Sequence, residues 1–264
     1  MGLRLSVGTS QVRIDEPRKH RPALSVIIPA YNERGRLEVP LGQVRDYALR
    51  TGKSVEVIVV DDGSRDGTAA LVQRFDPGPM SVQVLRNPLN RGKGYSVKRG
   101  MLAASGDVLL MSDADFSTPI QEVDRLLSWI EQGCAVVIGS RRMPESVLRP
   151  AQPWFRRLME RTFRAFRRSL MLRDIRDTQC GFKCFRRDAA REIFERLATD
   201  GFAFDCEVLG LARKLGYRVK EVGVLWCNDP DSRVRWVRDS IRMILSLLRI
   251  RRRLKRVRPL TSGQ

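Results

Sequence analysis

Two aspartates separated by one residue are the clearest sign of chemistry in this sequence. Asp113 and Asp115 lie in the stretch LMSDADFSTP, directly after an apolar run. Neighbouring carboxylates repel each other, so a cation must compensate for them. Carboxylate oxygens suit Mg²⁺ and Mn²⁺, and Mg²⁺ usually takes one or two carboxylates together with substrate phosphates. An acidic surface turn is the alternative, but the position after an apolar run favours a metal site.

A second acidic pair follows another apolar run, in VVDDGSRDGT. Turn and helix-cap chemistry explains Ser64, Asp66 and Gly67. It explains the adjacent acids Asp61 and Asp62 less well, because one acceptor is enough for a cap. Contact with a ligand is therefore the favoured interpretation of this pair.

A basic, glycine-rich stretch, RNPLNRGKGYSVKRG, lies between the two acidic motifs. It matches neither the P-loop nor the Rossmann glycine pattern. However, Gly92 and Gly94 flank Lys93 at an expected helix start, where free N–H groups and the helix dipole favour an anion. Together with the neighbouring acids, this stretch indicates that a phosphate group is bound here.

The elements that must hold these motifs alternate between strands and helices. Near-continuous apolar runs, typical of strands buried on both faces, occupy 24–28, 55–60, 82–85, 107–111 and 135–139. Helices are expected at 34–50, 67–75, 93–104 and 120–132. This alternation predicts an α/β fold with a doubly wound, mostly parallel sheet. Ligands bind such sheets at the carboxyl ends of the strands, where all the polar motifs lie.

The pattern changes after residue 140. Helices are expected at 154–172, 188–197, 205–215 and 234–254, and a strand at 218–226. The predicted organisation is a disordered leader at 1–22, one α/β domain at 23–232, and a basic amphipathic helix and tail at 233–264.

Several of these stretches together resemble a known family. They are SVIIPAYNE, EVIVVDDGSRDGT, RNPLNRGKGYSVKRGMLAASGDVLLMSDADFSTP, GSRR and DTQCGFKCFRR. They are similar to the family 2 inverting glycosyltransferases, and most of all to dolichyl-phosphate β-glucosyltransferases and related polyprenyl-phosphate glycosyltransferases. The resemblance covers residues 23–235 and implies the GT-A fold.

The resemblance also implies roles for individual residues. The nucleoside would be held by Pro29, Tyr31, Glu33 and Asp61 or Asp62, with Lys93 assisting the nucleotide. Asp113 and Asp115 would serve the diphosphate-bound metal, and Arg141 would face the acceptor phosphate. Phe116 and Ser117 replace residues often found after this triplet, so no third protein ligand is assigned.

The implied reaction moves glucose from UDP-glucose to a polyprenyl phosphate with inversion, giving a β-linked product. The acceptor phosphate is already anionic at pH 7, so a strong general base is less necessary than for an alcohol. The protein must instead bring two anions together, and arginines suit that task because they bind phosphate bidentately.

The candidate arginines are Arg141, Arg156, Arg157 and Arg233. Asp177, in DTQCGF, is the best remaining acid near the sugar, as a catalytic group or as a partner that orients arginines. Glu207 has a similar status, with a structural salt bridge favoured.

The chain carries 49 Lys and Arg against 30 Asp and Glu, a formal net charge of +19. In the helix expected at 234–254, Val234, Val237, Ile241, Leu245 and Leu248 form one side, and Arg235, Arg238, Arg242, Arg249 and Arg253 the other. Basic amphipathic helices of this kind bind anionic membrane surfaces, although an apolar stripe can also pack on the core.

The sequence contains no run of 18 apolar residues, the length that a bilayer-spanning helix needs. Its five cysteines include no CxxC pair, which fits a reducing compartment. The expected location is therefore peripheral, on the cytoplasmic face of a membrane.

Two other functions are compatible with the sequence. Donor choice rests on few contacts, so a polyprenyl-phosphate mannosyltransferase, or a family 2 enzyme with another sugar or acceptor, remains open. A basic nucleic-acid-binding protein would also match the charge. Aromatic residues are only 7%, and no recognised nucleic-acid motif occurs, so nucleic acid is not the expected partner.

Overall fold

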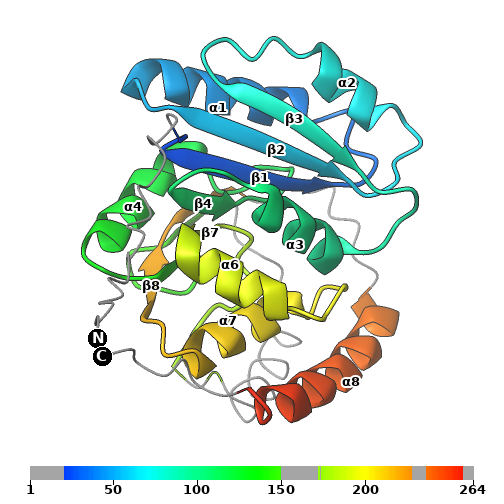
Figure 1. Ribbon diagram of the computed structural model, residues 1–264, viewed down its shortest axis with the longest axis vertical. Coiled ribbons are helices and arrows are strands. Elements are labelled where there is room, and N and C mark those ends of the chain that lie inside the picture. Colours follow the sequence, from blue (N-terminus) through cyan, green and yellow to red (C-terminus); the bar gives the residue numbers. More distant parts are fainter. Residues whose placement is uncertain (1–20, 150–171, 173, 228–235, 258–264) are drawn as a thin grey trace, which may run out of the picture.

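A mixed sheet forms the centre of the described chain (Figure 1). The computed structural model describes residues 21–149, 172, 174–227 and 236–257. The seven strands of this sheet, in spatial order, are β3 (Ser81–Arg86), β2 (Val55–Asp61), β1 (Leu24–Ala30), β4 (Val108–Met111), β7 (Lys183–Arg186), β5 (Val136–Ser140) and β8 (Val219–Gly223). Neighbouring strands are parallel except at β7, which is antiparallel to both β4 and β5.

Helices cover both faces of the sheet, as expected of a doubly wound fold. The helices are α1 (Glu38–Thr51), α2 (Thr68–Arg74), α3 (Lys93–Ala103), α4 (Val123–Glu131, after a 3₁₀ turn at Ile120–Glu122), α6 (Arg187–Arg196), α7 (Phe204–Lys214) and α8 (Trp236–Leu254). One apolar cluster joins α1, α2 and α4 to one face, and a second joins α3, α6, α7 and α8 to the other. A separate two-stranded sheet pairs β6 (Val147–Arg149) with β9 (Leu225–Cys227).

Burial follows the apolar pattern of the strands. Every residue of β2 and β5 is buried, as is nearly all of β1. The run at 82–85 is different, because β3 is an edge strand whose residues are only partly buried or exposed. The order β2-β1-β4 places the carboxyl ends of three buried strands side by side, and these ends carry the polar motifs.

The strands of the second half differ from the expectation in three respects. The strand β7 was not expected, because FKCF is short and carries a lysine. The strand expected at 218–226 is two strands, since Val224 separates β8 from β9. The strand β6 was also not expected.

The helix α8 faces its neighbours differently from the predicted division into two sides. The described side chains of α8 begin at Leu245. Among them, Leu247, Ile250 and Leu254 are buried against the core, while Leu245 and Leu248 are 50% and 42% exposed. The exposed leucines therefore share their face with Arg249 and Arg252 instead of opposing the arginines. Their helical spacing of three and four residues places these four side chains together.

Among the described helices, none combines the length and apolarity that crossing a bilayer requires. Residues 1–20 of the leader expected at 1–22, residues 154–171 of the helix expected at 154–172, and residues 258–264 of the tail lie outside the described residues.

The tight contact between α3 and the sheet generates a stability prediction. A methyl group added at Gly100 would lie 2.5 Å from Ile27 Cγ2 and 3.0 Å from Val60 Cγ2. We expect Gly100→Ala to lower the free energy of unfolding by about 1–3 kcal/mol, because both neighbours are fully buried. Denaturant unfolding measures the change.

Gly42→Ala is the matched control. It lies inside α1 with no atom within 4 Å of the added carbon, so we expect stabilisation by up to about 1 kcal/mol. Equal stability of the two variants would contradict the packing described here.

Candidate active site

The two acids after β2 have different surroundings, which the sequence did not distinguish. Asp62 is fully engaged with the loop before α3. Its Oδ1 accepts hydrogen bonds from Asn87 Nδ2 (2.7 Å) and the Arg91 N–H (2.9 Å), and its Oδ2 accepts one from the Gly92 N–H (2.8 Å). Asp62 therefore holds in place the loop that directly precedes Lys93.

Asp61 keeps one buried oxygen available. Its Oδ1 accepts a hydrogen bond from the Ser64 N–H at 2.8 Å, and the side chain is fully buried. Its Oδ2 accepts no hydrogen bond from any described residue, although Arg86 Nε lies 3.4 Å away. A buried carboxylate oxygen of this kind is suited to accept a hydrogen bond from a ligand.

The end of β1 and the loop after it lie beside the loop that follows β2. Pro29 is partly buried, and Tyr31 is 45% exposed. Glu33 pairs with Arg36, whose Nη2 donates to Glu33 Oε1 at 2.9 Å. The Asn32 N–H donates to Ser64 Oγ, which ties this loop to the one after β2.

Asp113 and Asp115 lie at the carboxyl end of β4, on a sharp turn. Phe116 has a φ of +46°, a conformation that non-glycine residues rarely adopt. The Ser117 N–H donates to Asp115 Oδ1 at 2.9 Å and fixes that side chain. Burial raises the pKa of Asp115, and the negative charge of Asp113 raises it further. Negative charge is thus concentrated on this turn.

Lys93 lies directly against this pair of acids. Its Nζ is 2.5 Å from Asp113 Oδ1. Burial lowers the pKa of the Lys93 ammonium, but the charges of Asp113 and Asp205 outweigh burial and raise it. Burial likewise opposes ionisation of Asp113, yet the positive charges of Lys93, Lys183 and Arg141 hold its pKa below the usual range. Both groups are therefore charged at neutral pH.

A pocket opens beside the acids. Its lining includes Asp113, Asp115, Thr118, Phe182 and Trp226, so the turn after β4, the segment before β7 and the strand β9 all contribute. The Cys227 N–H donates to the Ser117 carbonyl oxygen at 2.7 Å and holds β9 against the acidic turn.

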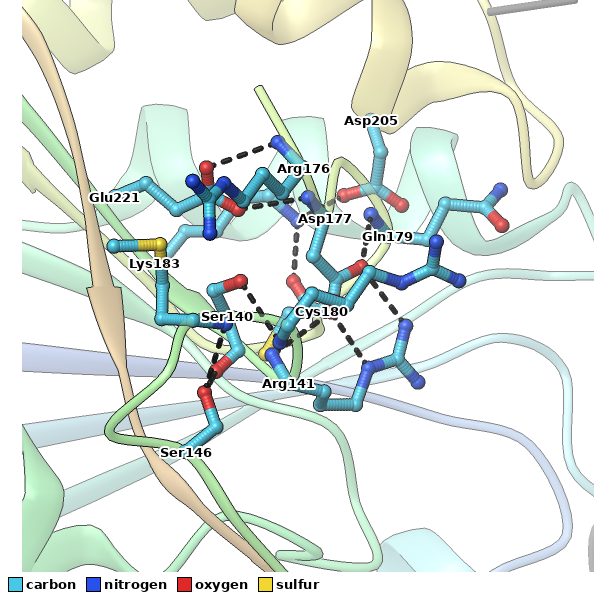
Figure 2. Close-up of polar contacts among 12 residues, drawn as sticks. Ser140, Arg141, Ser146, Arg176, Asp177, Gln179, Cys180, Lys183, Asp205 and Glu221 are labelled. Atoms are coloured by element: carbon cyan, nitrogen blue, oxygen red, sulfur yellow. Dashed lines mark hydrogen bonds and ion pairs between the residues drawn. The ribbon is translucent and has the colours of Figure 1, made fainter. Parts of the chain in front are cut away.

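Arg141 adjoins this pocket and is held by Asp177 (Figure 2). The guanidinium donates from Nε to Asp177 Oδ2 (2.7 Å) and from Nη2 to Asp177 Oδ1 (3.0 Å). The Arg141 N–H donates to the same carboxylate at 3.1 Å. Arg141 Cζ also lies 5.4 Å from the ring centre of Trp226, which lines the pocket. Arg141 thus has both a fixed orientation and a position next to the acids.

Asp177 is itself held in place by hydrogen bonds with Glu221 and Gln179. Its N–H donates to Glu221 Oε1 at 2.7 Å, and the Gln179 N–H donates to Asp177 Oδ1 at 3.2 Å (Figure 2). Burial opposes its ionisation, but the Arg141 charge and hydrogen bonds hold the pKa of Asp177 well below the usual range. This geometry favours the orienting role over proton transfer.

Three predicted site residues lie outside the described residues: Arg156, Arg157 and Arg233. Glu207, considered as a second acid, is buried on α7 and lies 3.6 Å from Arg253 Nη1 of α8. That contact matches the structural salt bridge favoured for it.

Sequence reasoning missed Lys183, Asp205 and Gly181. Lys183 is 1% exposed, and its Nζ is 2.5 Å from Asp205 Oδ1. A carbon added at Gly181 would lie within 2.0 Å of Asp113 Oδ2, so only glycine allows the carboxylate this position. A lysine within the apolar stretch FKCF was the one available signal, because lysine is rarely buried without a partner.

The donor set fits a divalent cation that also binds a ligand. No group of three or more His, Cys, Asp or Glu side chains that could hold a metal occurs in the described part of the chain. Among the described residues, Asp113 and Asp115 are the carboxylates that line the pocket, and water or a bound phosphate would add further ligands. That is the usual arrangement for Mg²⁺ in enzymes that act on phosphate compounds.

Comparisons with known proteins agree with this geometry. Residues 25–194 match the model of glycosyl transferase family 2. A dolichyl-phosphate β-glucosyltransferase from Dictyostelium discoideum is 39% identical over 240 residues, covering 86% of this chain and 73% of its own.

Two solved structures share the fold. Glucosyl-3-phosphoglycerate synthase from Mycobacterium tuberculosis, solved with Mn²⁺, UDP-glucose and phosphoglyceric acid, gives a TM-score of 0.63 at 19% identity, covering 92% of this chain and 82% of that one. A mannosyltransferase from Pyrobaculum calidifontis, solved with GDP-mannose and Mn²⁺, gives a TM-score of 0.56 at 23% identity, and the match covers 81% of this chain and 59% of that one. The expected GT-A fold is thus confirmed.

The resemblance found in the sequence motifs is confirmed as well: the chain belongs to glycosyl transferase family 2 and is similar to the dolichyl-phosphate β-glucosyltransferases.

Proposed function

We propose that this enzyme transfers glucose from UDP-glucose to a polyprenyl phosphate with inversion at C1, giving a β-linked lipid-phosphate sugar. One observation carries the proposal. The acids Asp113 and Asp115 line a pocket whose neighbouring wall holds Arg141, fixed by Asp177. A metal-bound diphosphate on the acids and an acceptor phosphate on the arginine would therefore meet. The relatives named dolichyl-phosphate β-glucosyltransferases support the acceptor class.

Asp61 is the acid we assign to the nucleoside. Both oxygens of Asp62 already accept hydrogen bonds, whereas Asp61 Oδ2 is buried and accepts none among the described residues. A uracil ring presents one imide N–H, which suits a single carboxylate acceptor. Tyr31, Pro29 and Glu33 would border the same nucleoside, as expected from the sequence.

Asp113 and Asp115 would hold the divalent cation, Mg²⁺ or Mn²⁺. When bound, the cation offsets the charge of the diphosphate and stabilises it as a leaving group. The M. tuberculosis synthase, which shares the fold, was solved with both Mn²⁺ and UDP-glucose.

Arg141 would bind the acceptor phosphate, which is the nucleophile. The phosphate is already ionised at neutral pH, so its placement and the offset of its charge are the main tasks. Asp177 acts through Arg141 as a positioning residue, because its carboxylate is committed to the guanidinium. The assignments of Arg156, Arg157 and Arg233 to the two phosphates stay predictions.

The proposal includes peripheral attachment to the cytoplasmic face of an anionic membrane through α8. Leu245 and Leu248 are exposed on the same face as Arg249 and Arg252. Leu247, Ile250 and Leu254 of α8 are buried against the core instead, which leaves these two leucines half exposed. Leucines beside arginines on one exposed face match an anionic interface.

A transfer assay tests the function. Label from UDP-[¹⁴C]glucose should enter a short polyprenyl phosphate only when Mg²⁺ or Mn²⁺ is present, and GDP-mannose should give little product. Asp115→Ala should slow transfer by about a hundredfold or more, because several kcal/mol of charge stabilisation is lost. Asp46→Ala, an exposed acid on α1, should have no effect. Equal transfer by Asp115→Ala, or preferred transfer of mannose, would contradict the proposal.

Gly181→Ala tests the position of Asp113. The added methyl group would overlap the Asp113 carboxylate, so we expect Mn²⁺ affinity in the presence of UDP to fall on the order of tenfold. Isothermal titration measures the affinity. Gly201→Ala, with no atom within 4 Å of the added carbon, is the control and should bind Mn²⁺ normally. Normal Mn²⁺ affinity in Gly181→Ala would show that the Asp113 position is unimportant.

Liposome flotation tests the membrane face. The wild-type protein should float with vesicles rich in anionic lipid, and less so at high salt. The double variant Leu245→Asp/Leu248→Asp should lose most of this binding. The control Leu49→Asp/Leu102→Asp changes the net charge equally at two other exposed leucines and should still float. The idea fails if the wild type stays in the soluble fraction, or if both double variants behave alike.

A further inference from the structure

Lys93 occupies the position that a cation at the acidic pair requires. Its ammonium group is 2.5 Å from Asp113 Oδ1 and is attracted to Asp115 as well. A divalent cation bound to Asp113 would repel an ammonium group that shares the same carboxylate. The two cations therefore compete for one acid, and Lys93 has to move when a metal binds.

The backbone around Lys93 is closely packed, so the side chain is the part of Lys93 that would move. The carbon of an alanine at Gly94 would lie 2.3 Å from the Thr199 carbonyl oxygen, and one at Gly92 would lie 2.6 Å from the Asp200 carbonyl oxygen. The start of α3 is thus packed tightly against the segment before α7, while Asp62 holds the preceding loop.

A second acid, Asp205, also lies near Lys93. Lys93 Nζ is 6.0 Å from the ring centre of Phe204, the residue before Asp205, and Asp205 is among the charges that raise the Lys93 pKa. Asp205 is 4% exposed and is kept in place by the buried Lys183. The Asp205 carboxylate, paired with Lys183, therefore stays near Lys93 as a second negative charge.

We propose that Lys93 is a coupling residue: it neutralises Asp113 in the unloaded protein and transfers to the donor diphosphate when cation and nucleotide bind together. This inference rests on the proposed function and deepens it by assigning an order to ligand binding. Cation alone binds weakly, because it must displace Lys93 and leave the ammonium without its partner. Cation with diphosphate binds well, because the diphosphate accepts the displaced ammonium group.

The proposal predicts that loss of the Lys93 charge changes the affinities for Mn²⁺ and for UDP in opposite directions. Removal of the Lys93 charge should strengthen the binding of Mn²⁺ alone while weakening the binding of UDP. If Lys93 had only a structural role, its loss would weaken the binding of both Mn²⁺ and UDP. If Lys93 only bound phosphate, its loss would not change the binding of Mn²⁺ in the absence of UDP. Lys93→Arg keeps the charge and should keep the wild-type order of affinities.

Isothermal titration of the intact chain tests the proposal with MnCl₂ alone, and then with UDP at saturating Mn²⁺. In the wild type, Mn²⁺ should bind on the order of tenfold tighter when UDP is present, within the usual range of coupling between sites. In Lys93→Gln, Mn²⁺ alone should bind about tenfold tighter than in the wild type, UDP should bind about tenfold more weakly, and the coupling should largely disappear.

Lys53→Gln is the matched control. It removes the same charge from a lysine that pairs with Asp124, and it should leave both affinities unchanged. Thermal unfolding of each variant verifies the fold. Unchanged or weaker binding of Mn²⁺ alone to a folded Lys93→Gln would overturn the coupling role. Failure of the wild type to bind UDP and Mn²⁺ at all would instead overturn the proposed function.

Discussion

The repulsion between two carboxylates at the end of β4 is the constraint on which the site depends. Burial and the negative charge of Asp113 raise the pKa of Asp115, so it is energetically unfavourable to ionise both carboxylates without a nearby cation. The protein supplies Lys93 and, further away, Lys183 and Arg141, which keep Asp113 ionised. The charges around the pocket thus remain close to balanced in the absence of ligand. In the proposed coupling, Lys93 moves from Asp113 to the diphosphate as the cation binds, so its charge stays within the site.

The short antiparallel strand β7 links the acidic turn after β4 to Arg141 after β5. It pairs with both β4 and β5, so the segment before it crosses the carboxyl ends of those strands. That segment contributes Asp177 to Arg141 and Gly181 to the close approach of Asp113, and β7 itself contributes Lys183. The same few residues therefore orient the arginine, accommodate the acid and anchor the buried ion pair. A single strand accounts for much of the geometry between the acids and Arg141.

Local pattern was enough to predict the strands whose ends carry the acids. Apolar runs identified β1, β2 and β4, and the rule that parallel strands end at one edge brought Asp61 and Asp113 together. The pattern did not distinguish Asp61 from Asp62, because the difference lies in hydrogen bonds to a loop about 30 residues away. Nor did it reveal the Lys93–Asp113 pair, since the distance between two side chains depends on packing that no local pattern encodes.

The second half was harder to predict for physical reasons. FKCF is only four residues long, and its lysine argues against a buried strand unless the partner Asp205 is known. In α8 both leucines and arginines recur at helical spacing, so the sequence alone did not decide which leucines face the core. The contact of Leu254 with Gly210 of α7 selects the face that contains Leu247, Ile250 and Leu254.

Anomalous scattering from crystals grown with MnCl₂ and UDP tests the central claim most directly. The account predicts a single strong manganese peak bonded to oxygens of Asp113 or Asp115 and to the diphosphate, with the Lys93 ammonium moved off Asp113. A nucleotide bound without manganese at these two acids, or a manganese peak elsewhere on the protein, would contradict it.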